Sequence, residues 1–235
     1  MKFVIASDHR EFFQKHHSIE FDELLNSKQL AQLNSAIDET LAERLHDSIA
    51  DLASVSSGKL FMAGHDLWRS NTQVKKVVTS KQFAEVAIDL TEQRALRLGC
   101  DQLFPELKGR IYKSAVSDAY HQLLDLNTNL QGISSFDGVC CGLMLCLKGE
   151  GSESADMDSI FSKKPGNGVF FHTDFPINFQ HLKKYPLHRY LLIVYVKNNA
   201  AYKRNDNDPH THSLKQFDYI FDERLKDKFH PMVYR

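Results

Sequence analysis

Residues 168–175 of the chain are GVFFHTDF, a short apolar run that leads into His172 and Asp174. Side chains two positions apart on a strand point to the same face, so both groups can face one metal ion. Such an ion needs a third ligand from another segment of the chain. The stretch therefore has two interpretations, half of a metal centre or the solvent-exposed end of an ordinary strand.

The composition is that of an ordinary globular protein. The chain has 235 residues, of which 42% are hydrophobic and 25% charged, and its formal net charge is -1. No basic stripe is present, so we expect a small-molecule partner and no nucleic acid, which binds through concentrated Lys and Arg. The longest apolar runs, GVCCGLMLCL and YLLIVYV, are too short to span a bilayer. The oligomeric state stays open.

The four cysteines indicate a reducing environment. They are Cys100, Cys140, Cys141 and Cys146, and they form no C-x-x-C pair. The adjacent Cys140 and Cys141 lie in an apolar run, which favours small buried hydrophobic residues over metal ligands. The first residues also lack the apolar core of a signal peptide. We therefore expect a cytoplasmic protein.

We expect a single domain, residues 1–235, with a mainly helical layer over 1–95 and mainly strands over 96–235. Apolar residues at helical spacing predict helices over 10–17, over a segment that begins near Ser27 as its cap, and over 80–95. Asp8 and Glu11 have the spacing of a capping box for the first of these helices. The alternating stretch SIEFDEL, residues 18–24, favours a short strand.

The second part contains four short runs rich in bulky apolar residues, separated by Gly, Pro, Asn and Asp. These runs cover residues 96–104, 138–149, 166–175 and 188–196. Such runs are typical of strands in a sandwich or barrel. The polar stretch 149–168 has little to bury and is predicted to be a mobile surface loop.

The order of these segments resembles the phytanoyl-CoA dioxygenase family of non-haem iron, 2-oxoglutarate-dependent oxygenases. FFQKHHSIEFDELLNSKQLAQLNSAI, residues 12–37, resembles the family's opening helix, strand and helix. KKPGNGVFF, residues 163–171, resembles a late strand, and HRYLLIVYV resembles the strand that follows it. The resemblance implies an α+β fold, a double-stranded β-helix (a cupin-like jelly roll) with an N-terminal helical layer packed on its outer sheet.

The resemblance also implies a chemistry. In the family, two histidines and a carboxylate hold Fe(II), leaving positions open for 2-oxoglutarate and oxygen. The carboxylate belongs to an H-x-D or H-x-E motif early in the barrel, and the second histidine follows several strands later. An arginine on the strand after the late one binds the distal carboxylate of 2-oxoglutarate. An active member would hydroxylate a small or lipid-like substrate.

In a first placement, His172 and Asp174 are the family's H-x-D motif. His210, His212 and His230 are then candidate third ligands, and His212 with Arg224 comes closest to the family's spacing between histidine and arginine. The metal ligands would be His172, Asp174 and His212, and Arg224 would bind 2-oxoglutarate. Residues 175–235 would have to supply almost all of the remaining barrel strands, and few segments there have a strand pattern.

In a second placement, GNGVFF is the late strand itself. The family's second histidine then falls near Ile177 or Asn178, neither of which is a good iron ligand, and Arg189 is the carboxylate-binding residue. Upstream, Asp101 and Asp137 lack a histidine two positions before them. The iron triad would be missing, and the protein would be a non-catalytic small-ligand or protein-binding member of the fold. The chain length and the PGNGVFF match favour this placement.

Two further polar stretches contain histidines. NDNDPHTHSLK, residues 205–215, contains a His-x-His pair, but its many turn residues predict an exposed loop. GHDLWRS, residues 64–70, favours structural packing around the single tryptophan. The chain has no G-x-S-x-G elbow, phosphate-binding glycine loop or dinucleotide fingerprint, so serine hydrolases and nucleotide-dependent enzymes are not expected.

Overall fold

A computed structural model describes residues 5–107, 118–150 and 159–235. The α-helices in these ranges are α1 (Ser7–His16), α2 (Ser27–Leu45), α3 (Ser57–Ala63), α4 (Thr72–Val78), α5 (Lys81–Thr91), α6 (Ala119–Leu124) and α7 (Gln180–Lys184). The strands are β1 (Ser18–Phe21), β2 (Leu96–Phe104), β3 (Asn127–Thr128), β4 (Phe136–Lys148), β5 (Gly168–His172), β6 (Ile177–Asn178), β7 (Arg189–Tyr202) and β8 (Met232–Tyr234). All four runs that were predicted as strands contain one.

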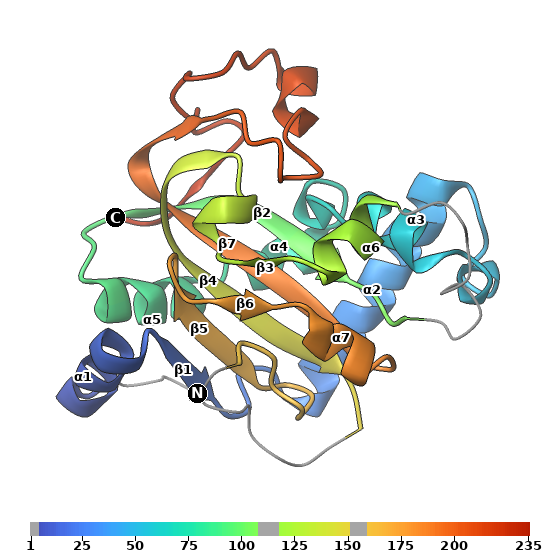
Figure 1. Ribbon diagram of the computed structural model, residues 1–235, viewed down its shortest axis with the longest axis horizontal. Coiled ribbons are helices and arrows are strands. Elements are labelled where there is room, and N and C mark those ends of the chain that lie inside the picture. Colours follow the sequence, from blue (N-terminus) through green and yellow to red (C-terminus); the bar gives the residue numbers. More distant parts are fainter. Residues whose placement is uncertain (1–4, 108–117, 151–158) are drawn as a thin grey trace.

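The main sheet has six strands in the order β1-β5-β4-β7-β2-β8, and every neighbouring pair is antiparallel. A second, two-stranded sheet of β3 and β6 lies in front of it in Figure 1. The α-helices α2, α4 and α5 lie behind the main sheet. This arrangement is the predicted α+β, cupin-like jelly roll with a helical layer on its outer sheet.

The central strands β4 and β7 are buried on both faces. Leu143 and Ile193 belong to the cluster that includes the helical layer, whereas Met144 and Val194 belong to the cluster on the opposite face. Because side chains alternate along a strand, such strands need apolar residues at every position. This explains the unbroken runs GVCCGLMLCL and YLLIVYV. We call the face against the helices the outer face and the other the inner face.

The outer face is covered mainly by α2 and α5, whose apolar stripes pack on the sheet. Helix α2 begins one residue earlier than expected at its cap. Asn26, and not the predicted Ser27, is the N-cap, and Asn26 and Gln29 exchange side-chain to backbone hydrogen bonds of 3.0 and 2.9 Å. Asparagine caps a helix as well as serine does, so the sequence allowed either choice.

Helix α1 also begins differently from the prediction. Its N-cap is Ala6, whose backbone N–H donates to Nδ1 of His9 at 3.2 Å. The capping box expected from Asp8 and Glu11 therefore does not form. Both residues lie within the first turns of the helix and are exposed.

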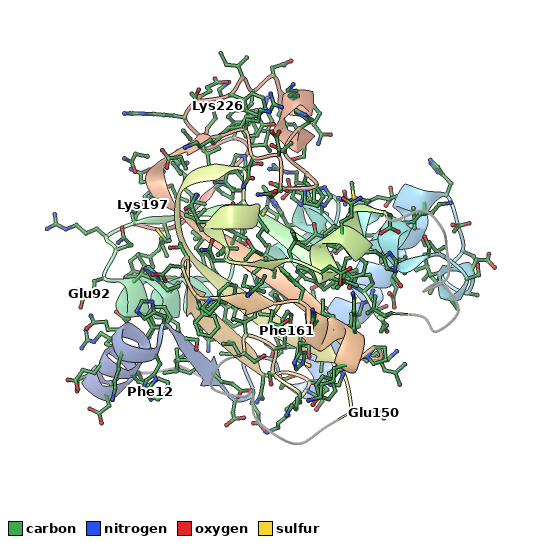
Figure 2. The ribbon with its side chains drawn as sticks, viewed as in Figure 1. Phe12, Glu92, Glu150, Phe161, Lys197 and Lys226 are labelled. Carbon is green, nitrogen blue, oxygen red and sulfur yellow. The ribbon has the colours of Figure 1, made fainter. Side chains whose placement is uncertain are left out.

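The inner face packs against β3, β6, α6, α7 and part of the C-terminal segment. Its core is rich in fully buried rings, including Phe104, Tyr120, Phe179 and Tyr190. Phe161, labelled in Figure 2, is also 1% exposed in this core. The prediction of a surface loop over 149–168 is therefore wrong for its last part. Its central residues, 151–158, lie outside the described ranges.

Within the described residues, no helix is long and apolar enough to cross a membrane.

We predict that Ile193→Ala lowers the free energy of unfolding by about 2–5 kcal/mol, because truncation removes a fully buried side chain and leaves a cavity. Urea denaturation of both proteins measures the difference. Ile220→Ala is the control, since Ile220 is 72% exposed and its truncation should change stability by less than about 0.5 kcal/mol. Equal costs for the two variants would contradict the two-faced burial of β7.

Candidate functional site

His172 and Asp174 lie together, and a third residue, His17, joins them. Nδ1 of His17 is 2.9 Å and Nδ1 of His172 is 2.5 Å from the same oxygen, Oδ1 of Asp174. One ligand atom from each residue lies within 4.8 Å of the others. Among the described residues, this is the one group of three or more His, Cys, Asp and Glu side chains with metal-binding spacing. We call it the His–His–Asp cluster.

The backbone explains why these residues meet. His17 is the left-handed C-cap of α1 and leads directly into β1. Strand β1 pairs with β5 so that Ser18 lies opposite Phe171, and the next step of the ladder brings His17 beside His172. The backbone N–H of His172 donates to the carbonyl of His17 at 2.8 Å. Both histidines are therefore attached to a paired, hydrogen-bonded backbone.

The carboxylate of Asp174 is held in its charged form. The hydrogen bond from His17 is the largest influence, and together with His172 it lowers the pKa of Asp174 to about 2 despite some desolvation. The three side chains are 46%, 43% and 57% exposed for His17, His172 and Asp174. The cluster is therefore a charged, accessible surface site, unlike the iron centre expected inside a barrel.

A groove of about 420 Å³ adjoins the cluster. His17 and His172 form part of its wall, and the remaining wall comes from α1, the end of α5 and the neighbouring ends of β4 and β7. Glu92 and Lys197, both on the left of Figure 2, also line it. A small molecule in this groove would reach the two imidazoles.

The structure does not bring His212 or Arg224 to the cluster. His212 is exposed, and its ring lies 5.9 Å from that of Phe221. Arg224 is exposed and forms an isolated bridge with Ala201 near the end of β7. The segment after β7 that carries both lies at the top of Figure 1, whereas β1 and β5 lie in the lower half.

Arg189 begins β7, as expected for the second placement, but its side chain lies on the outer face. It is 7% exposed and donates to Asp38 at 2.7 Å and to Asn34 at 3.3 Å, both on α2. Its guanidinium therefore hydrogen-bonds to helix α2 of the helical layer. Ile177 and Asn178 form β6, and they pair with Thr128 and Asn127 of β3.

These positions decide whether the oxygenase cofactors fit. In the chain, strand β5 comes after β2, β3 and β4 and before β6, β7 and β8. The paired β3 and β6 offer two asparagines, a threonine and an isoleucine in place of histidines and a carboxylate. Fe(II) prefers imidazole and carboxylate ligands, and 2-oxoglutarate needs a cation facing it. His65, Asp208 and His210 also lie on the inner face, but among the described residues they do not form a group with metal-binding spacing. The described part of the inner face therefore does not fit an oxygenase iron centre.

The inner face instead contains a cavity of about 50 Å³, which we call the inner cavity. Its wall is largely apolar, with side chains from β2, α6 and β7. Ser134 Oγ and His210 Nε2 are buried, have no hydrogen-bond partner, and belong to residues that line this cavity. An unsatisfied buried polar atom costs about 1–3 kcal/mol, so the unsatisfied atoms of Ser134 and His210 indicate a polar partner in the cavity. Ser135, which also lines the cavity, interacts with the carboxylate of Asp208.

His210 stacks on His65 with ring centroids 4.0 Å apart and planes inclined by 6°. His65 Nδ1 lies 3.2 Å from the side-chain oxygen of Gln102. The NH₂ group of Gln102 donates to two backbone carbonyls, so the amide orientation is set and its oxygen is the atom that faces His65. Because that oxygen can only accept a hydrogen bond, Nδ1 of His65 carries the proton. Burial, helped by His65, lowers the pKa of His210 to about 2. Burial also raises the pKa of Asp208, which accepts from the backbone N–H of His210 at 2.8 Å.

The prediction of an exposed loop over 205–215 is therefore wrong for Asp208 and His210, which turn inward. Sequence reasoning also missed His17 and Ser134. His17 stands directly before a predicted strand, and that was the available signal, but the pairing of this strand with 168–172 could not be read from the chain. For Ser134 we find no sequence signal.

No family model matches the chain, and no curated protein matches it. Solved structures do. The α-ketoglutarate-dependent carbocyclase SnoK and epimerase SnoN, both from nogalamycin biosynthesis, superpose with TM-scores of 0.66 and 0.63 at 11% and 14% identity. SnoK covers 97% of this chain and 96% of its own, and SnoN covers 96% and 97%. CytC3 with Fe(II) and α-ketoglutarate gives a TM-score of 0.55 at 12% identity, covering 97% and 88%. The chain thus shares its fold with these three solved structures.

We predict that His210→Gln makes protein stability less sensitive to acid. His210 stays neutral in the folded protein, whereas in the unfolded chain it gains a proton below its ordinary pKa of about 6.5. Protonation of His210 in the unfolded chain should therefore cost wild type on the order of 2 kcal/mol of stability between pH 7 and pH 5, and the variant should lack this cost. Denaturant titrations at both pH values measure this. His46→Gln, at an exposed position, should behave as wild type, and equal losses in all three proteins would contradict a neutral His210.

Proposed function

We propose that this protein is a non-catalytic, small-ligand-binding member of the oxygenase fold. The ligand is an uncharged molecule with a short apolar body and one hydrogen-bonding group. The observation that carries this proposal is the presence of Ser134 Oγ and His210 Nε2, buried and unsatisfied, in residues around one largely apolar cavity. Pockets with apolar walls and a few convergent polar groups are the usual form of small-molecule sites.

The charges around the inner cavity select against an anion. Asp208 lines the cavity, and His210 is held neutral by burial. Arg189, which would have balanced a carboxylate, is directed to Asp38 on the outer face. A dianion such as 2-oxoglutarate would therefore lose its hydration without gaining a paired cation, which is costly.

The size of the cavity limits the ligand. A single water needs about 10–15 Å³ on this measure, so about 50 Å³ accommodates a few non-hydrogen atoms. The hydroxyl of Ser134 can donate or accept, and the free ring nitrogen of His210 can do either according to its tautomer. A hydroxyl, carbonyl or amide group satisfies both.

The test uses two probes with the same four-carbon chain, 1-butanol and butyrate. Leu123, Leu130, Ile133, Leu192 and Val194 line the cavity, and their methyl signals in a labelled sample report on occupancy. We expect saturable shifts with butanol, in the millimolar range as fits five non-hydrogen atoms, and none with butyrate. Ser134→Ala should weaken butanol binding at least threefold.

Ser54→Ala, at an exposed position, is the matched control and should bind butanol as wild type does. Equal shifts with butanol and butyrate, or butanol binding that is unchanged in Ser134→Ala, would overturn the proposal. A folded variant is verified by its unfolding curve before the titration.

A second candidate is an Fe(II) and 2-oxoglutarate-dependent hydroxylase acting on a small or lipid-like substrate. The fold supports it, and the two histidines and one carboxylate of the His–His–Asp cluster are the donor set of such enzymes. Aerobic incubation with Fe(II), ascorbate and 2-oxoglutarate tests it through succinate formation. We expect no more succinate from wild type than from His172→Ala, and a clear excess from wild type would favour this candidate.

A further inference from the structure

We infer that the His–His–Asp cluster is a binding site for a divalent first-row transition-metal ion at the outer edge of the jelly roll. The site consists of His17 Nδ1, His172 Nδ1 and a carboxylate oxygen of Asp174. It lies away from the inner cavity and does not depend on the function proposed for that cavity.

The separations of the ligand atoms suit such an ion. Ligand atoms that each lie about 2.1 Å from a Zn²⁺ ion are about 3.0–3.5 Å apart from one another. Here the two imidazole nitrogens are 2.9 and 2.5 Å from the carboxylate oxygen, and the three atoms lie within 4.8 Å of one another. Small side-chain adjustments therefore bring the cluster to tetrahedral spacing. Half-exposed side chains can make such adjustments without disturbing the core.

The backbone keeps the ligands together without a metal ion. His17 and His172 are linked by a backbone hydrogen bond at the end of the β1–β5 ladder, and Asp174 is two residues further along the chain. Because the folded chain already holds the donors close together, metal binding does not have to order a loop. Preorganised donors of this kind raise affinity by reducing the entropy lost on binding.

The donor types select the ion. Two imidazoles and one carboxylate suit Zn²⁺, Co²⁺, Ni²⁺ or Fe²⁺, whereas Mg²⁺ and Ca²⁺ prefer oxygen ligands throughout. The charged carboxylate of Asp174 supplies the negative charge that a dication needs. Three protein ligands leave a fourth position free, and the groove of about 420 Å³ at His17 and His172 gives water or a small ligand access to it.

The experiment titrates metal-free full-length protein with Co²⁺, following the visible absorption that appears when nitrogen and oxygen ligands surround the ion, and then displaces Co²⁺ with Zn²⁺. We expect one ion per chain, displaced by Zn²⁺ and not by Mg²⁺. His17→Ala, His172→Ala and Asp174→Asn should each weaken binding about tenfold or more. The side chains are accessible, so the variants should keep the unfolding curve of wild type.

His16→Ala is the matched control, because His16 is adjacent to His17 in the chain and does not belong to the cluster. It should bind Co²⁺ as wild type does. The inference is overturned if wild type binds no Co²⁺, or if the three cluster variants bind it as tightly as His16→Ala does. The butanol titration does not bear on this outcome, so the metal site and the proposed function of the inner cavity can fail separately.

Discussion

The pairing of β4 with β7 is the constraint on which the rest of the structure depends. Both strands are long and lie at the centre of the main sheet, where their side chains alternate between two separate cores. The two cores depend on each other because both are built on the same two strands. Alternate residues of β4 and β7 face α2 and α5, and the residues between them face β3, β6 and the C-terminal segment. Burial of each large apolar side chain contributes about 1.5–3 kcal/mol, so these two strands concentrate much of the stabilising free energy.

This two-faced sheet keeps two chemically different regions apart. The inner face is rich in aromatic rings and leaves a small, weakly polar cavity beside His210. The outer edge, where β1 closes on β5, carries exposed imidazoles and the carboxylate of Asp174. We therefore propose a metal ion at the second region and an uncharged ligand at the first, because the donor groups of the two regions differ.

Helices and strands were predicted correctly where the spacing of apolar residues was compatible with only one type of secondary structure. The four apolar runs became strands, and the helical periodicity of 80–95 became α5. The errors occurred where several short-range choices are nearly equal in free energy. Asn26 and Ser27 are equally good caps, and a polar stretch such as 149–168 can still bury Phe161 once a core is available to receive it. The turn residues of 205–215 were recognised, but the side chains of a turn can also point into the protein. Asp208 and His210 do so and line the inner cavity.

The sequence by itself determined that helices dominate the first part of the chain and strands the second, because helical stripes and short apolar runs differ in their periodicity. It also supplied His172 and Asp174, which lie close together at the end of β5. Only the tertiary structure decided that β5 pairs with β1 and β4, that His17 and not His212 completes the cluster, and that Arg189 faces α2. These facts depend on which strands pair and in what register, and pairing between distant segments is set by the packing of the whole core rather than by neighbours in the chain.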